Sequence, residues 1–127
     1  MTDSSEKSLY ERLGGYDAIA AVTDDFLERL FSDPVIGYYW AGDSHDTKRR
    51  DRQLIVDFMC EAAGGPVFYT GRDMKTSHNG LGISESQYDI LMTHCQATLD
   101  KFEVPDREKG EVCSFLDGLR ADIEEKQ

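Results

Sequence analysis

The sequence has few cysteines and few basic residues. Its three cysteines, Cys60, Cys95 and Cys113, form no CxxC pair and show no zinc-ligand spacing. We therefore expect free thiols in a reducing, cytoplasmic location. The 14 Lys and Arg residues stand against 25 Asp and Glu, which gives a formal net charge of −11. Because nucleic acids are bound largely by basic side chains that neutralise phosphates, this balance argues against a DNA or RNA partner.

Long hydrophobic runs are also absent. No segment reaches the roughly 18 consecutive apolar residues of a membrane-spanning helix, and the N-terminus has no apolar signal core. The surplus of acidic residues would also repel an anionic membrane surface. With 127 residues, 39% of them hydrophobic, the chain can bury one core. We therefore expect no membrane partner, and a monomer with a single domain over residues 1–127, of which residues 1–7 form a polar tail.

The periodicity of the chain is helical. Apolar residues recur at steps of three and four over residues 15–34, 48–63, 84–102 and 105–123. Ser84 and Gln87 have the spacing of a capping box, which predicts the start of the third helix. Proline or Gly-Gly-Pro breaks separate these stretches, and no run alternates with period two for long enough to predict a sheet. The sequence therefore predicts an all-α protein.

One segment, residues 67–82 (VFYTGRDMKTSHNGLG), lacks long periodicity. It allows only a short helix around Met74 to His78, and a connector of this length is more often functional than idle. His78 lies among the apolar residues Met74, Leu81 and Ile83. A buried neutral imidazole in such surroundings is a good axial ligand for haem iron. From spacing alone, a hydrogen-bonded core histidine is the commoner interpretation.

The stretch Tyr69–Ile83 resembles the proximal segment of the group I truncated haemoglobins. It contains the pattern Met-Lys-x-x-His-x-Gly-x-Gly-Ile, in which the family's histidine binds the iron. The resemblance extends to LYERLGG at residues 9–15, to Asp25-Phe26 and to Gly64-Gly65-Pro66, and it covers roughly residues 8–123. It implies a shortened globin fold, a two-over-two helical sandwich around haem b, with His78 as the metal ligand.

The resemblance also implies which side chains contact the haem on its proximal side. These are Met74, Lys75, His78, Ile83, Tyr88 and Leu91, with Val112 and Leu116 closing the cavity from the last helix. Lys75 would pair with a propionate at the haem edge, unless it is a solvated surface lysine. Tyr39 or Trp40 would supply the aromatic ring that the family places against the haem, although core packing alone would also explain these rings.

On the distal side the sequence departs from the family. Phe26 is followed by Leu27, where the family usually has a tyrosine that bonds the gas ligand. Two distal-helix positions that are often polar in the family become Asp51 and Ile55. The expected lining is Phe26, Leu27, Leu54, Ile55, Phe58 and Met59, which is largely apolar and lacks a donor for bound dioxygen.

The linker after Trp40 is about three residues longer than is usual in the family. A polar side chain from this linker or from the next helix could therefore reach the iron as a sixth ligand or as a donor. His45 is the first candidate, against the alternative of an exposed loop histidine, and Lys48 and Gln53 follow it. His94, which lies within the third helix, is expected to be structural.

These features favour a haem protein that binds a diatomic gas reversibly, with dioxygen, nitric oxide or carbon monoxide as the ligand. One alternative is an enzyme, a nitric oxide dioxygenase or a peroxidase-like protein that works with a separate reductase. Another is a redox or gas sensor with a sixth protein ligand. A cofactor-free helical interaction module is the remaining alternative, and it predicts no visible absorption at all.

Overall fold

A computed structural model describes residues 7–125 of the protein, and within that range it contains helices but no strand. Most of the predicted N-terminal tail, residues 1–6, lies outside the described residues. The elements are α1 (Leu9–Leu13), α2 (Tyr16–Ser32), the 3-10 helix η1 (Gly37–Trp40), α3 (His45–Ala62), α4 (Met74–His78), α5 (Glu85–Lys101), α6 (Asp106–Gly118) and α7 (Arg120–Ile123). None of these helices is both long and apolar enough to cross a membrane.

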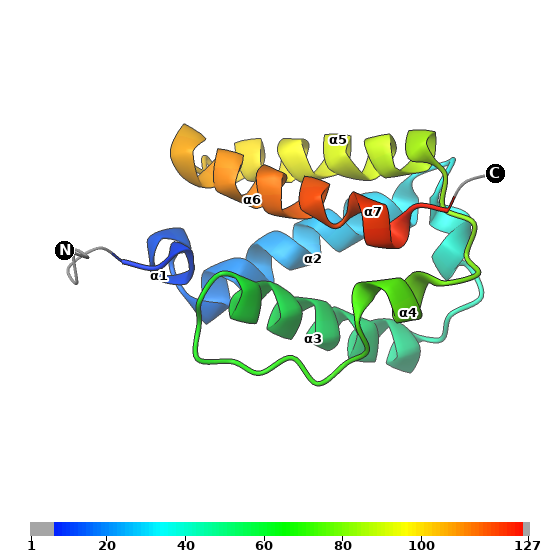
Figure 1. Ribbon diagram of the computed structural model, residues 1–127, viewed down its shortest axis with the longest axis horizontal. Helices are drawn as coiled ribbons and strands as arrows, with labels where there is room; N and C mark the ends of the chain where they lie inside the picture. Colours follow the sequence, from blue (N-terminus) through cyan, green and yellow to red (C-terminus); the bar gives the residue numbers. More distant parts are fainter. Residues whose placement is uncertain (1–6, 126–127) are drawn as a thin grey trace.

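The four long helices form two pairs. Helix α2 packs against α3 on one side and against α5 on the other, and α5 packs against α6 (Figure 1). The connector that follows α3 runs along the outer side of that helix and leads to α4, which packs against α7. The prediction of an all-α, two-over-two helical sandwich is confirmed.

Helix α2 begins and ends at the predicted breaks. Gly14 and Gly15 have φ angles of 109° and 86°, values that favour glycine, and they turn the chain sharply into α2. At the other end, the Asp33 carboxylate accepts hydrogen bonds from the backbone N–H groups of Val35, at 2.7 Å, and Ile36, at 3.0 Å. This turn around Pro34 directs the chain into η1.

Two helix boundaries differ from the prediction. Helix α3 begins at His45 rather than Lys48, because the Ser44 side chain accepts a hydrogen bond from the Thr47 N–H at 3.1 Å and caps the helix earlier. The last predicted helix is divided at Gly118 into α6 and α7. Glycine is a weak helix former, and the break allows α7 to turn towards α4. The capping box of α5 at Ser84 and Gln87 is confirmed.

The buried apolar residues form three clusters. One joins α2 to α3, a second joins α5 to α6, and a third, made of Leu27, Leu30 and Ile36, ties α2 to the segment that enters η1. Cys60 and Cys95 are buried in the first two clusters, and both thiols are free. Members of the second and third clusters also line a cavity between the layers.

Candidate functional site

The cavity between the helix pairs has a volume of about 490 Å³. This size lies within the range of about 300–1,000 Å³ that is usual for small-molecule and cofactor sites. Its walls are mainly apolar and come from all four long helices, η1, α4 and the connector. Of the predicted cofactor contacts, the cavity is lined by Phe26, Leu27, Tyr39, Trp40, Leu54, Ile55, Phe58, Met59, Met74, His78, Ile83, Tyr88, Leu91, Val112 and Leu116.

Helix α4 presents His78 to the cavity. The helix is short, and it is capped by the Asp73 carboxylate, which accepts a hydrogen bond from the Thr76 N–H at 3.0 Å. His78 Nδ1 lies 2.8 Å from the carbonyl oxygen of Met74 and 3.0 Å from the hydroxyl of Ser77. Because a carbonyl oxygen can only accept, Nδ1 is the donor in this hydrogen bond, which leaves Nε2 as the ring nitrogen that can bind a metal. This arrangement makes His78 a good metal ligand.

Helix α3 presents one face to the cavity. Residues at positions 51, 54, 55, 58 and 59 line it, because steps of three and four fall on the same side of a helix. Four of these residues are apolar, and the fifth is Asp51. Burial and the charge of Asp43 raise the pKa of the Asp51 carboxyl above its ordinary range. The distal face is therefore apolar apart from one carboxyl group.

An aromatic group forms the wall at η1. Tyr38 and Tyr39 are stacked, with ring centroids 4.3 Å apart, and Tyr39 meets Trp40 edge-on at 6.2 Å. The Tyr39 hydroxyl donates a hydrogen bond to the Gln87 side chain at 3.0 Å, and the Gln87 amide donates to the Tyr38 hydroxyl at 3.3 Å. Burial, together with the contact with Tyr38, raises the pKa of Tyr39 to about 12. Tyr39 is therefore a neutral, fixed part of the wall.

The basic residue of the cavity wall is Arg72. Lys75, which the resemblance places at the cofactor edge, is exposed and does not line the cavity. Arg72 precedes α4 in the connector, close in sequence to Tyr69, whose hydroxyl donates a hydrogen bond to the Arg72 carbonyl oxygen at 2.6 Å. The Tyr69 ring also packs edge-on against Phe58, with centroids 5.1 Å apart. Arg72 is exposed as well, but it is the basic residue among those that line the cavity, and these contacts hold its backbone beside the Phe58 wall.

The three candidates for a sixth ligand do not line the cavity. His45 is the first, exposed residue of α3. The Lys48 ammonium lies 5.2 Å from the centre of the Phe31 ring. The Gln53 amide donates hydrogen bonds to Tyr16, at 2.6 Å, and to Asp57, at 2.9 Å. His94 also lies outside the cavity lining, and its Nε2 is 2.7 Å from the Asp33 carboxylate.

Sequence reasoning missed several residues of the lining. Asp43, Tyr69 and Arg72 come from loops, where helical periodicity gives no signal of direction. Leu119 and Ile123 reach the cavity because the chain breaks after α6 and α7 turns back. Tyr69 and Arg72 lie within the proximal motif Tyr69–Ile83, so their positions were available as a signal, whereas Asp43, Leu119 and Ile123 depend on the tertiary arrangement.

The residues present fit a flat, apolar macrocycle such as haem. The imidazole of His78 offers one nitrogen ligand, the apolar walls suit the ring, and Arg72 offers a positive charge for an acidic substituent. Within residues 7–125, no three His, Cys, Asp or Glu side chains converge as a metal site made only of protein groups. Haem brings four nitrogen ligands of its own, so a single histidine is sufficient.

A second cavity, of about 330 Å³, lies beside the first. It is lined almost wholly by apolar residues of α1, α2, α3, α5 and α6. Both cavities share Val22, Thr23, Met59, Leu99 and Val112 as wall residues. These shared residues therefore separate the larger cavity from a second apolar cavity.

Comparison with known proteins agrees with this geometry. A family model described as bacterial-like globin matches residues 8–125. The chain is 26% identical over 117 residues to a group 1 truncated hemoglobin of Tetrahymena thermophila, covering 92% of this chain and 94% of that protein. It is 34% identical over 103 residues to group 1 truncated hemoglobin GlbN of Synechocystis sp., covering 78% and 81%. The crystal structure of truncated hemoglobin from Tetrahymena pyriformis in its Fe(III) form superposes with a TM-score of 0.85 at 25% identity, covering 94% of this chain and 100% of that one.

Proposed function

Because this chain belongs to the bacterial-like globin family, whose hemoglobins bind haem iron, we propose that His78 is the protein ligand to a non-covalent haem b. Dioxygen or nitric oxide binds reversibly at the iron of this haem. The haem supplies the iron at which the gas binds, and the chain supplies the ligand and the walls. The observation that carries the proposal is the 2.8 Å hydrogen bond from His78 Nδ1 to the Met74 carbonyl oxygen, which orients the ring and leaves Nε2 as the nitrogen available to the iron.

The walls of the cavity support this role. Apolar side chains such as Ile83 and Leu91 limit the access of water, which keeps the local dielectric low around the ligand. Tyr39 is held in place by Gln87, so it provides a rigid aromatic surface. Arg72 is the cation of the lining and would pair with a propionate.

The distal wall favours reversible binding of the gas. Leu27, 4% exposed, occupies the position expected for a tyrosine donor, and Ile55 is apolar as well. Dioxygen bound to a ferrous haem in this cavity would carry partial negative charge, which a hydrogen-bond donor on the wall would stabilise. Without one, dioxygen leaves faster, whereas carbon monoxide depends less on a donor.

The alternative functions have less support from the positions of the side chains. A sensor with a sixth protein ligand needs a side chain that reaches the iron, and His45, Lys48 and Gln53 lie outside the cavity lining. An enzyme that oxidises nitric oxide or consumes peroxide needs a reductase. The net charge of −11 would attract a basic partner of that kind, but it does not select one.

The experiment is to compare the absorption spectra of the native protein, His78→Ala and His94→Ala. Each is recorded in the ferric, ferrous and carbon monoxide forms. We expect the native protein to purify with one haem b per chain and His78→Ala to lose the haem or to bind it weakly. His94→Ala is the matched control, because His94 pairs with Asp33 outside the cavity lining, and it should keep a native spectrum.

Two results would contradict the proposal. The first is a native protein that takes up no haem when haem is added. The second is a His78→Ala protein whose ferrous and carbon monoxide spectra match those of the native protein. In that case another residue would be the iron ligand.

A further inference from the structure

Asp51 is the one charged residue among those that α3 contributes to the cavity. It lies one turn before Ile55, and its side chain is partly buried. Its neighbours on the same face are Leu54, Phe58 and Met59. A carboxyl group among apolar walls is costly when it is ionised, unless a cation or several hydrogen bonds compensate it.

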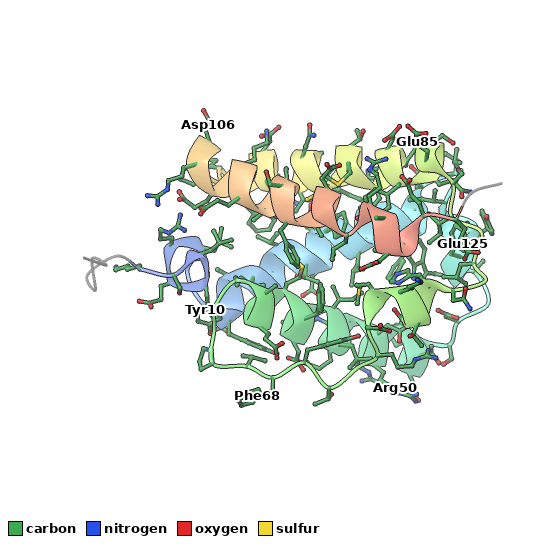
Figure 2. The ribbon with its side chains drawn as sticks, viewed as in Figure 1. Tyr10, Arg50, Phe68, Glu85, Asp106 and Glu125 are labelled. Carbon is green, nitrogen blue, oxygen red and sulfur yellow. The ribbon has the colours of Figure 1, made fainter. Side chains whose placement is uncertain are left out.

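No described residue forms an ion pair or a hydrogen bond with the Asp51 carboxyl. The basic residues near it on α3 are engaged elsewhere or point outward. Arg49 pairs with Asp46, Arg52 with Asp24 at 2.7 Å, Lys48 contacts the Phe31 ring, and Arg50 is exposed at the outer edge of α3 (Figure 2). Arg50 lowers the pKa of Asp51, but by less than burial and Asp43 raise it. The carboxyl group therefore has no partner of its own.

The other groups around the cavity do not supply that partner. The titratable side chains that line the cavity or flank it are Asp43 before α3, Asp24 on α2, Tyr39 on η1, Tyr69 and Arg72 in the connector, His78 on α4, and Tyr88 and Cys95 on α5. Arg72 is the one full positive charge among the lining residues, and the Asp24 carboxylate is already held by Arg52. The propionates of a bound haem would add negative charge. Together these charges favour the neutral form of Asp51.

We propose, on the basis of the gas binding proposed above, that Asp51 sets the dioxygen affinity of this protein through its own proton. The neutral carboxyl has an O–H group, which can donate a hydrogen bond to a ligand that carries partial negative charge. The carboxylate cannot donate, and its charge repels such a ligand. Dioxygen is therefore held more tightly when Asp51 is protonated. Carbon monoxide acquires little charge, so its affinity changes little.

The test is to measure dioxygen and carbon monoxide dissociation by stopped flow from about pH 4.5 to pH 8, a range that extends upward from the ordinary aspartate pKa. In the native protein, dioxygen release should slow by about tenfold as Asp51 becomes protonated. Asp51→Asn keeps a neutral donor and should release dioxygen slowly at every pH. Asp51→Leu removes the donor and should release it quickly at every pH.

Two further variants sharpen the test. Asp43→Asn removes a charge that favours the neutral form of Asp51, so the midpoint of the pH dependence should move to lower pH. Asp46→Asn is the matched control, because Asp46 is on the same helix, has a side chain that is 80% exposed and does not line the cavity. It should behave as the native protein does.

The protonation of Asp51 can also be followed by spectroscopy, without measuring a dissociation rate. The infrared stretching frequency of bound carbon monoxide responds to a nearby donor, so it should shift with pH in the native protein. It should be constant in Asp51→Leu. An equal pH dependence in the native protein and in Asp51→Leu, by either measurement, would overturn the proposal.

The two proposals fail in different ways. Absence of haem binding would overturn both of them. If haem and carbon monoxide bind through His78 but the pH dependence survives in Asp51→Leu, the role of Asp51 alone is wrong.

Discussion

The proximal and distal walls of the cavity are held in place by different forces. Around His78 the contacts are directional, because Asp73 caps α4 and the imidazole donates to the Met74 carbonyl oxygen. On the distal wall, Leu27 and Ile55 are positioned by apolar packing. Directional bonds fix the orientation of the His78 ring, whereas apolar packing tolerates the substitution of one side chain by another of similar volume. The iron ligand is therefore tightly specified, and the chemistry of the distal face is free to vary.

The C-terminal segment adds to the support of the proximal wall. The Glu125 N–H donates to the Ile83 carbonyl oxygen at 2.8 Å, and the Glu125 carboxylate accepts from the Gly82 N–H at 3.2 Å. Figure 2 shows Glu125 at the end of the molecule where α5 begins. These bonds hold the chain between His78 and α5, so the far end of the sequence stabilises the segment that carries the iron ligand.

The largest effect on stability should come from the packing of the distal wall. Leu30 is 3% exposed and belongs to the cluster that ties α2 to η1. Leu30→Ala should lower the free energy of unfolding by about 2–5 kcal/mol, because it removes a buried side chain and leaves a cavity. Urea unfolding of the haem-loaded protein at a fixed haem concentration measures this change. A loss below about 0.5 kcal/mol would mean that packing does not hold this wall.

A smaller effect should follow from one hydrogen bond beside the proximal wall. Tyr88 is 1% exposed, and its hydroxyl donates to the Leu116 carbonyl oxygen at 2.5 Å. Tyr88→Phe keeps the ring and removes the bond, which should cost about 0.5–1.5 kcal/mol. The same unfolding experiment measures it. An unchanged free energy of unfolding would show that this hydrogen bond contributes little to stability, which would contradict the role given above to directional bonds around the proximal wall.

The smallest effect concerns a polar link between α2 and α5. The hydrogen bond from His94 and those from two backbone N–H groups keep the pKa of Asp33 below its ordinary value. A lowered pKa in the folded state stabilises the protein above the unfolded pKa of about 3.9, and this contribution is lost as the pH falls through the folded pKa. Asp33→Asn should therefore be less stable than the native protein near pH 6, with a difference that shrinks under strongly acidic conditions. A difference that stays constant with pH would contradict this account.

The sequence predicted the proximal segment best, because its signals are local. The short helix Met74–His78 and the capping box at Ser84 are confirmed, and the resemblance to the group I truncated haemoglobins is confirmed by the comparisons. Helical periodicity also gave the positions on the α3 face. Both kinds of signal need only neighbouring residues in the chain.

The parts that the sequence could not give depend on turns and tertiary contacts. Helix α3 begins at His45 because Ser44 caps it, although the apolar pattern starts later. The apolar stripe continues through Leu119, so periodicity alone reads α6 and α7 as one helix. The cavity is lined by Arg72, which precedes α4 in the connector, and not by Lys75 of α4, a difference that neither charge nor periodicity predicts.

The central claim is that a fixed proximal histidine faces a distal wall in which Leu27 and Ile55 supply no hydrogen-bond donor. Stopped-flow dissociation of dioxygen and carbon monoxide from the native protein and from Leu27→Tyr at pH 7 tests it most directly. The account predicts fast dioxygen release by the native protein, at least about tenfold slower release by Leu27→Tyr, and little change for carbon monoxide. Slow dioxygen release by the native protein, unchanged in Leu27→Tyr, would contradict it and would show that another group already bonds the ligand.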